Sequence, residues 1–165
     1  MSVRRQATLY LPPPHDAAIE ALRSRFNPRQ FGLIRAHVTL CRGDEVADWD
    51  ALSGRLRDLG ESDVALTFGA PVRDGPLVYL PTTGDCRSFD ALRLALLAGG
   101  DSLPRRHDPH ITLVHPRNGS CSAADFAEIS RRCQPFSVLF RTVTLIEQVD
   151  GSRWKDLAHF GASGG

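Results

Sequence analysis

The amino-acid sequence predicts an α+β fold made of two similar lobes, which share a central cleft and are related by a pseudo-two-fold axis. Strand-like and helix-like segments follow one another in the same order twice along the chain. The tetrapeptide His37-Val38-Thr39-Leu40 recurs as His110-Ile111-Thr112-Leu113. Before it, Leu9-Tyr10-Leu11-Pro12 is matched by Val78-Tyr79-Leu80-Pro81. We therefore expect a duplicated fold with two antiparallel sheets flanked by helices.

The length of the chain suits one domain. Its 165 residues can bury roughly two-thirds of the surface that the unfolded chain exposes, so a stable core needs no disulfide. We treat residues 1–165 as a single domain, with lobes at about 1–72 and 73–160 and with strands free to exchange between the lobes.

In the first half, a β-prone segment over 7–11 ends at three prolines, which cannot continue a central strand. A helix is expected over 15–26, because its apolar residues recur at helical spacing. A connector then leads to a β-branched strand over 36–41. A second helix over 48–59, closed by a glycine, and a strand over 64–68 complete this half.

The second half repeats the order, with a strand, a helix, a strand and a helix over 76–80, 89–97, 110–114 and 123–133. Gly99 and Gly100 are expected to stop the first of these helices. A long β stretch follows over 136–149. The dipeptide Asp150-Gly151 then predicts a hairpin that returns the chain through 154–160.

The type of basic residue in the chain is more informative about its partners than the net charge. A net charge of +1 does not indicate a protein that coats DNA or a membrane. All of the 20 basic residues except Lys155 are arginine, and the planar guanidinium suits phosphate oxygens. We interpret this bias mainly as the codon usage expected of a GC-rich genome, and local phosphate recognition is compatible with it.

The cysteines and the N-terminus favour a cytoplasmic protein. Its 4 cysteines include no pair at the C-x₂-C spacing of a zinc or redox motif, so we interpret them as reduced thiols. The first residues contain no apolar run long enough for a signal peptide, and no segment approaches the length of a membrane span. We expect no membrane partner.

The recurring tetrapeptides carry the candidate chemistry. Side chains two apart on a strand point to the same face, so His37 and Thr39 project together while the residues between and after them face the core. The same holds for His110 and Thr112. If the lobes face one another, two imidazoles and two hydroxyls converge on one cleft.

Such a set suits a phosphodiester. With an unperturbed pKa of about 6.5, one imidazole can accept a proton from the attacking oxygen and another can protonate the leaving oxygen. Threonine hydroxyls can donate to the non-bridging oxygens. This chemistry needs no metal or cofactor. The alternatives are a structural histidine at either motif and a zinc site, although no carboxylate or cysteine recurs beside both motifs.

On these motifs, the chain resembles the 2H phosphoesterase superfamily, which includes 2′-5′ RNA ligase-like proteins and cyclic phosphodiesterases. The resemblance covers nearly the whole chain. It implies that His37 and His110 are the catalytic acid and base and that Thr39 and Thr112 bind phosphate. Family members commonly have proline before the motif histidine; Pro109 fits this pattern, whereas Ala36 departs from it.

The function we expect is a metal-independent phosphodiesterase that opens the 2′,3′-cyclic phosphate of RNA ends or nucleotides. One alternative is reversible 2′-5′ RNA ligation, in which an RNA 5′-hydroxyl replaces water; the net charge gives this only weak support. A second alternative is a nucleotide- or RNA-binding module without turnover. We expect a monomer with a nucleotide or RNA substrate and no DNA partner.

Five further residues are candidates for substrate binding. Tyr10 and Tyr79 end strands near the motifs and are expected either to stack a base or to pack in the core. Arg42 and Arg117 flank the motif strands, where they either grip phosphate or lie on the surface. His107 lies either at the cleft rim or, as we favour, on a solvent-exposed loop.

One histidine is excluded from the expected cleft. His115 lies at an odd offset from His110 along the strand direction, so strand alternation predicts that it points away from Thr112.

Overall fold

The computed structural model describes residues 1–98 and 104–161. Its helices are α1 (His15–Phe26), α2 (Pro28–Leu33), α3 (Trp49–Leu59), α4 (Arg87–Leu96) and α5 (Ala123–Arg132), with a 3₁₀ turn at Gly43–Glu45. Its strands are β1 (Val3–Tyr10), β2 (His37–Cys41), β3 (Val64–Phe68), β4 (Val72–Asp74), β5 (Leu77–Thr83), β6 (His110–Val114), β7 (Phe136–Phe140), β8 (Thr142–Val149) and β9 (Lys155–Gly161). Gly99 and Gly100, expected to stop α4, lie outside the described residues.

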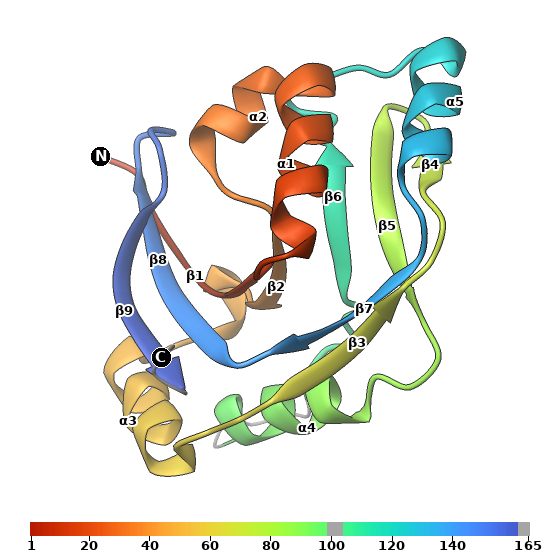
Figure 1. Cartoon of the computed structure of the whole chain (residues 1–165). Coiled ribbons are helices and arrows are strands. Elements are labelled where there is room, and N and C mark those ends of the chain that lie inside the picture. The colour runs from red at the N-terminus through yellow and green to blue at the C-terminus, as the bar shows by residue number, and fades with distance from the viewer. Residues whose placement is uncertain (99–103, 162–165) are drawn as a thin grey trace.

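The strands form two antiparallel sheets, which confirms the predicted fold class. One sheet has the order β2-β1-β8-β9; the other has the order β4-β5-β3-β7, and β6 also pairs with β5. The first sheet therefore takes its last two strands from the C-terminal part of the chain, and the second takes β3 from the N-terminal part. In Figure 1, β8 and β7 form one continuous path between the sheets. A division of the chain near residue 72 does not separate the two sheets.

The motif strands β2 and β6 are equivalent in detail. In each, the histidine and threonine are partly exposed, whereas the residue between them and the last two residues are buried. In each, the pairing register shifts by one residue directly after the motif threonine, at Leu40 and at Leu113. This shared irregularity supports the pseudo-two-fold relation between the lobes, because strand patterning alone does not require it.

The tyrosine-containing pair of segments is less equivalent than the sequence suggests. Tyr10 is paired with His37, but the partner of His110 is Pro81, and Tyr79 lies two residues earlier in the strand. The structural equivalent of Tyr10 is therefore Pro81, two residues after Tyr79, the residue that the sequence repeat aligns with Tyr10. Because side chains repeat every two residues along a strand, both tyrosines still lie on the motif face of their sheet.

The helices cross between the lobes and bring the motif strands together. The helix after the first strand, α1, packs against β6, whereas α4 packs against both β3 and β2. Figure 1 shows α1 and α2 at one end of the molecule and α3 and α4 at the other. Between them, Cα atoms of β2 and β6 come within 8 Å of one another. One continuous apolar core underlies both sheets.

Two buried arginines hold the crossing helices. Each lies in a recurring tetrapeptide, Glu20-Ala21-Leu22-Arg23 in α1 and Asp90-Ala91-Leu92-Arg93 in α4. Arg23 donates to the Ile34 carbonyl at 2.8 Å and pairs with Glu20 at 2.8 Å.

The second of these arginines links the two lobes. Arg93 donates to the carbonyls of Leu40 and Arg105 and forms an ion pair with Glu45 at 2.6 Å, with only 4% and 7% of the two side chains exposed. Burial alone would raise the pKa of Glu45, but hydrogen bonds from Arg93 and from the Arg42 backbone outweigh this effect and lower it. The contact fixes α4 on the first motif strand.

Some predicted elements are confirmed and others are wrong. Gly60 ends α3 with a φ of 64°, and the turn after β8 has positive φ at Asp150 and Gly151, 49° and 72°, as the sequence indicated. The expected β stretch over 136–149 is instead two strands in different sheets, β7 and β8. The connector after α1 contains α2, and β4 was not predicted. Among the described residues, no helix is long and apolar enough to cross a bilayer.

We predict that Arg93→Met lowers the free energy of unfolding by about 3–5 kcal/mol, because it leaves the buried Glu45 carboxylate without its main partner. Urea denaturation measures the change. Arg87→Met is the matched control on the same helix: Arg87 pairs with Asp85, and the two side chains are 90% and 53% exposed, so no measurable change is expected. Equal effects of the two substitutions would contradict the assigned role of Arg93.

Candidate active site

The two motifs share one cleft. His37 and Thr39 from β2 and His110 and Thr112 from β6 all line a cavity of about 980 Å³ between the lobes. The lobes thus bring together the four side chains that the sequence pattern singled out. The cleft is formed where β2 and β6 run next to one another, so its position follows directly from the crossing of the helices.

The backbone fixes both imidazoles in the same way. The Nδ1 atom of His37 lies 2.7 Å from the Arg35 carbonyl oxygen, and that of His110 lies 2.9 Å from the Asp108 carbonyl oxygen. A carbonyl oxygen only accepts hydrogen bonds, so Nδ1 carries the hydrogen in both rings. Each Nε2 is left to accept a proton when the ring is neutral or to donate one when it is charged.

His37 is poised in the neutral form. Removal of water by the surrounding protein lowers the pKa of His37 to about 4, the hydrogen bond to the Arg35 carbonyl opposes this shift, and the charges of Arg23 and His110 add to it. At neutral pH the free Nε2 of His37 is therefore a proton acceptor.

A glutamine orients one of the motif hydroxyls. Gln6 Nε2 donates to Thr39 Oγ1 at 3.2 Å and to Thr8 Oγ1 at 3.0 Å. Because the Thr39 oxygen accepts this bond, its own proton remains available to an oxygen in the cleft.

The motif cleft is strongly basic although the chain is nearly neutral. Six arginines and one carboxylate, that of Asp44, line it: Arg4, Arg5, Arg23, Arg29, Arg42 and Arg117. Within residues 1–98 and 104–161, no carboxylate lies within ion-pair distance of Arg29, Arg42 or Arg117. Unpaired guanidinium groups facing a cleft favour an anionic ligand.

His107 bridges the lobes, so our expectation of a solvent-exposed loop residue is wrong. Its Nε2 donates to the Thr39 carbonyl at 3.0 Å, and its ring stacks on Phe89 at 6.0 Å. Burial and the charges of Arg93 and Arg42 lower the pKa of His107 to about 4. The loop that holds the Asp108 carbonyl against His110 is thus tied to the other motif strand.

The prediction for His115 is also wrong. It lines the motif cleft, and its Nδ1 accepts a hydrogen bond from the Arg117 backbone at 3.1 Å. The register shift at Leu113 and the end of β6 at Val114 interrupt the alternation on which the prediction rested. Burial and the charges of Arg117 and Arg4 lower the pKa of His115.

The two tyrosines have different surroundings. Tyr10 hydrogen-bonds Asp156 at 3.2 Å, and the Arg35 guanidinium covers its ring at 4.4 Å. Tyr79 packs edge-on against His110, with ring centroids 5.8 Å apart, and lines a second cavity. Tyr10 packs edge-on against His37 in the same way, with ring centroids 6.4 Å apart. The pseudo-symmetry therefore extends to the contact between tyrosine and motif histidine but not to the other surroundings of the two side chains.

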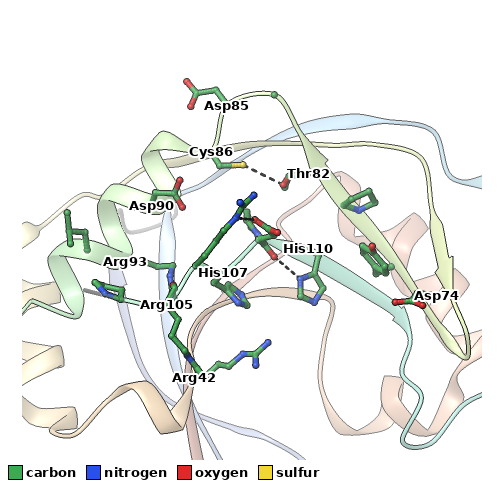
Figure 2. Close-up of a pocket in the computed structure, with 18 of the residues that line it drawn as sticks. Arg42, Asp74, Thr82, Asp85, Cys86, Asp90, Arg93, Arg105, His107 and His110 are labelled. Carbon is green, nitrogen blue, oxygen red and sulfur yellow. Dashed lines mark hydrogen bonds and ion pairs between the residues drawn. The ribbon is translucent and has the colours of Figure 1, made fainter. Parts of the chain in front are cut away.

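The second cavity, which we call the side pocket, measures about 1150 Å³ and lies between β5, the start of α4 and residues 104–109. Figure 2 shows Cys86, the residue before α4, and Asp90 of α4 on one side of it and His110 on the other. His110 and Arg42 line both the side pocket and the motif cleft, so the two cavities meet there. His37 lines the motif cleft but not the side pocket.

No metal-binding cluster accompanies the motifs in the described parts of the chain, where no group of three His, Cys, Asp or Glu side chains is placed to hold an ion. Gln6, Arg29 and the carbonyls of Arg35 and Asp108 also belong to the site and were not predicted from the sequence. A backbone carbonyl has no signature in sequence. The recurring Ala-Leu-Arg of α1 and α4, in contrast, was a readable signal of the two buried arginines.

Two lobes that each contribute one His-x-Thr strand to a shared cleft define a duplicated two-histidine fold. The sequence model of the 2′-5′ RNA ligase superfamily matches residues 11–152. The chain belongs to this superfamily, the 2H phosphoesterases.

Solved structures agree with the fold. A phosphoesterase crystal structure is 18% identical with a TM-score of 0.65, covering 99% of this chain and 100% of that chain. Escherichia coli LigT bound to 3′-AMP is 19% identical with a TM-score of 0.63 and 98% coverage of both chains. LigT bound to phosphate is 18% identical with a TM-score of 0.61 and 96% coverage of both. A comparison with curated proteins gave no match.

We predict that long-range ¹H–¹⁵N NMR spectra of the free protein at pH 7 show His37 with its hydrogen on Nδ1 and His107 with its hydrogen on Nε2, because a backbone carbonyl accepts from each. Spectra of His37→Gln and His107→Gln variants assign the signals. A hydrogen on Nε2 of His37 would contradict the proposed availability of that atom.

Proposed function

We propose that the protein hydrolyses 2′,3′-cyclic phosphodiesters of nucleotides or RNA ends, without a metal ion, by acid–base catalysis. In this mechanism His37 is the base and His110 is the acid. The observation that carries the proposal is the common cleft: both imidazoles offer Nε2 to one basic cavity that is also lined by Thr39 and Thr112. The size of the cavity, about 980 Å³, is adequate for a nucleotide.

The proposed reaction is an in-line displacement at phosphorus. A water oxygen attacks while Nε2 of His37 accepts the water proton. The bond between phosphorus and one ribose oxygen breaks, and that oxygen takes the proton from Nε2 of charged His110. The product is a nucleoside phosphomonoester, and exchange with solvent resets the two rings. Hydroxyls of Thr39 and Thr112 and the charge of Arg42 stabilise the negative non-bridging oxygens in the transition state.

The relatives support the choice of substrate. Their solved structures include Escherichia coli LigT bound to phosphate and to 3′-AMP. The ligands share the phosphate group, and the second joins it to a nucleoside. The chain has the same fold and presents unpaired arginines to its cleft, so a nucleoside phosphate is the class of ligand that best fits it.

A second candidate is reversible 2′-5′ RNA ligation, which uses the same two histidines with an RNA 5′-hydroxyl in place of water. Its support is the basic wall of the motif cleft, to which Arg29, Arg117 and Trp154 contribute. Arg4 lies over the Trp154 ring at 5.4 Å. Arginine beside an aromatic ring is a surface on which a second nucleic-acid strand can lie.

We predict that the wild type hydrolyses 2′,3′-cyclic AMP and an oligonucleotide that ends in a cyclic phosphate, with and without EDTA. His37→Ala and His110→Ala should each lower kcat by about 10²–10⁴-fold, because each removes one proton-transfer group. Product formation followed by ³¹P NMR and by gel measures the rates. His159→Ala is the matched control, since this histidine lies on β9 and lines neither cavity.

The outcomes separate the functions. Joined oligonucleotides in the presence of a 5′-hydroxyl strand indicate ligation. Tight binding of both ligands without turnover in the wild type would identify a binding module instead of an enzyme. Loss of turnover on addition of EDTA, restored by a divalent cation, would refute the metal-independent mechanism.

We predict that kcat/KM falls as the pH is lowered through about 4, because only then does the base His37 become protonated. Above this pH His37 is neutral, so its titration no longer changes kcat/KM. Rates of 2′,3′-cyclic AMP hydrolysis across pH 3.5–8 measure the limb, and recovery of the rate after return to pH 7 controls for unfolding. An acid limb centred near the unperturbed imidazole value of about 6.5 would contradict the assignment of His37 as the base.

A further inference from the structure

We propose that the side pocket binds the nucleoside of the substrate, with the base against Tyr79 and the ribose beside His110. This inference rests on the proposed function and deepens it, because it states on which side of the phosphate the substrate lies. It has three supports: the asymmetry of the tyrosines, the chemistry of the pocket wall and the place where the two cavities meet.

The surroundings of the tyrosines leave only one of them available to a ligand. On the first lobe, Arg35 covers the Tyr10 ring, Asp156 holds its hydroxyl, and Tyr10 lines neither the motif cleft nor the side pocket. On the second lobe, Tyr79 lines the side pocket directly next to His110. A planar base can therefore stack beside the second motif but not in the equivalent position beside the first.

The wall of the side pocket suits a base rather than a second phosphate. Apolar side chains line it, among them Leu94, which is 52% exposed on α4. The carboxylates of Asp74 and Asp90 also line it, and they can accept hydrogen bonds from the N–H groups of a base. A phosphate in the same place would be repelled by both carboxylates.

The arginines of the side pocket are already engaged, with one exception. Arg93 pairs with Glu45, Arg105 with Asp44 at 3.1 Å, and Arg106 with Asp108 at 3.1 Å. Arg42 has no carboxylate within ion-pair distance in the described chain, and it lies where the side pocket meets the motif cleft. Free positive charge is thus found at the phosphate end of the pocket, and the carboxylates of Asp74 and Asp90 lie among the apolar residues that line the rest.

The position of the ribose decides which histidine is the acid and which is the base. His110 lines both cavities, so a ribose in the side pocket brings its 2′ and 3′ oxygens to this ring. The ribose oxygen that leaves phosphorus then takes its proton from Nε2 of His110. The attacking water approaches from the opposite side, where Nε2 of His37 accepts its proton. This geometry assigns the acid and the base independently of any titration.

The test compares two substrates that share the reacting group. One is 2′,3′-cyclic AMP, and the other is 1-O-methylribose 2′,3′-cyclic phosphate, which has no base. Tyr79→Ala should lower kcat/KM for the nucleotide by roughly tenfold to a hundredfold more than kcat/KM for the methylriboside, the usual effect of losing one stacked base. Any loss that comes from the contact between Tyr79 and His110 is common to the two substrates. Tyr79→Phe should retain the wild-type values. Tyr10→Phe, in the tyrosine outside both cavities, is the matched control.

A second variant, at another residue of the side pocket, tests the proposal independently of Tyr79. Leu94→Ala removes an apolar contact from the α4 wall of the side pocket at an already exposed position, so it should also weaken the nucleotide and spare the methylriboside. Equal losses for the two substrates in these variants, or no loss for the nucleotide, would overturn the proposal.

The binding of 3′-AMP separates this proposal from the proposed function. If the wild type hydrolysed neither substrate, the proposed function would be wrong, and calorimetric titration with 3′-AMP would still judge the pocket. Weaker binding by Tyr79→Ala than by the wild type and by Tyr10→Phe supports the nucleoside site. Equal affinities of the three proteins overturn it.

Discussion

The site depends on the close approach of β2 and β6, two strands that belong to different sheets and share no ladder of hydrogen bonds. The crossing of α1 and α4 between the lobes imposes this approach. The Arg93 guanidinium fixes it by donating to the carbonyl of Leu40, the last residue of the first motif. His107 adds a second tie, to the Thr39 carbonyl. The distance between the two imidazoles is therefore set by buried contacts rather than by the cleft surface.

The sequence predicted the motif strands and their shared face because strand alternation is a local property that four residues already display. It predicted α3 and the turn at Asp150 for the same reason. It did not predict the tautomers of His37 and His110, which depend on backbone carbonyls that any residue can supply. It misplaced His115, because a one-residue register shift has no signature in composition. It also joined β7 and β8, whose separation depends on which sheet each strand enters.

The two lobes are equivalent at the motif strands and differ around them. The two motif strands keep the same burial, the same register shift and the same carbonyl contact to the histidine, and both present an imidazole to one cleft. Outside the motifs the lobes have diverged. The Arg35 guanidinium covers the Tyr10 ring, whereas Tyr79 lines the side pocket beside the second motif. A symmetric frame thus carries an asymmetric site, as the proposed reaction, with one leaving group and one attacking group, requires.

The exchange of strands between the sheets bears on how the chain folds. The first sheet needs β8 and β9, so the N-terminal half leaving the ribosome exposes an unpaired edge of β1 until nearly the whole chain has been synthesised. Contacts of such long sequence separation close slowly and form together. The duplicated halves are consequently not independent folding units, and neither half is expected to persist as a stable fragment when the chain is cut between them.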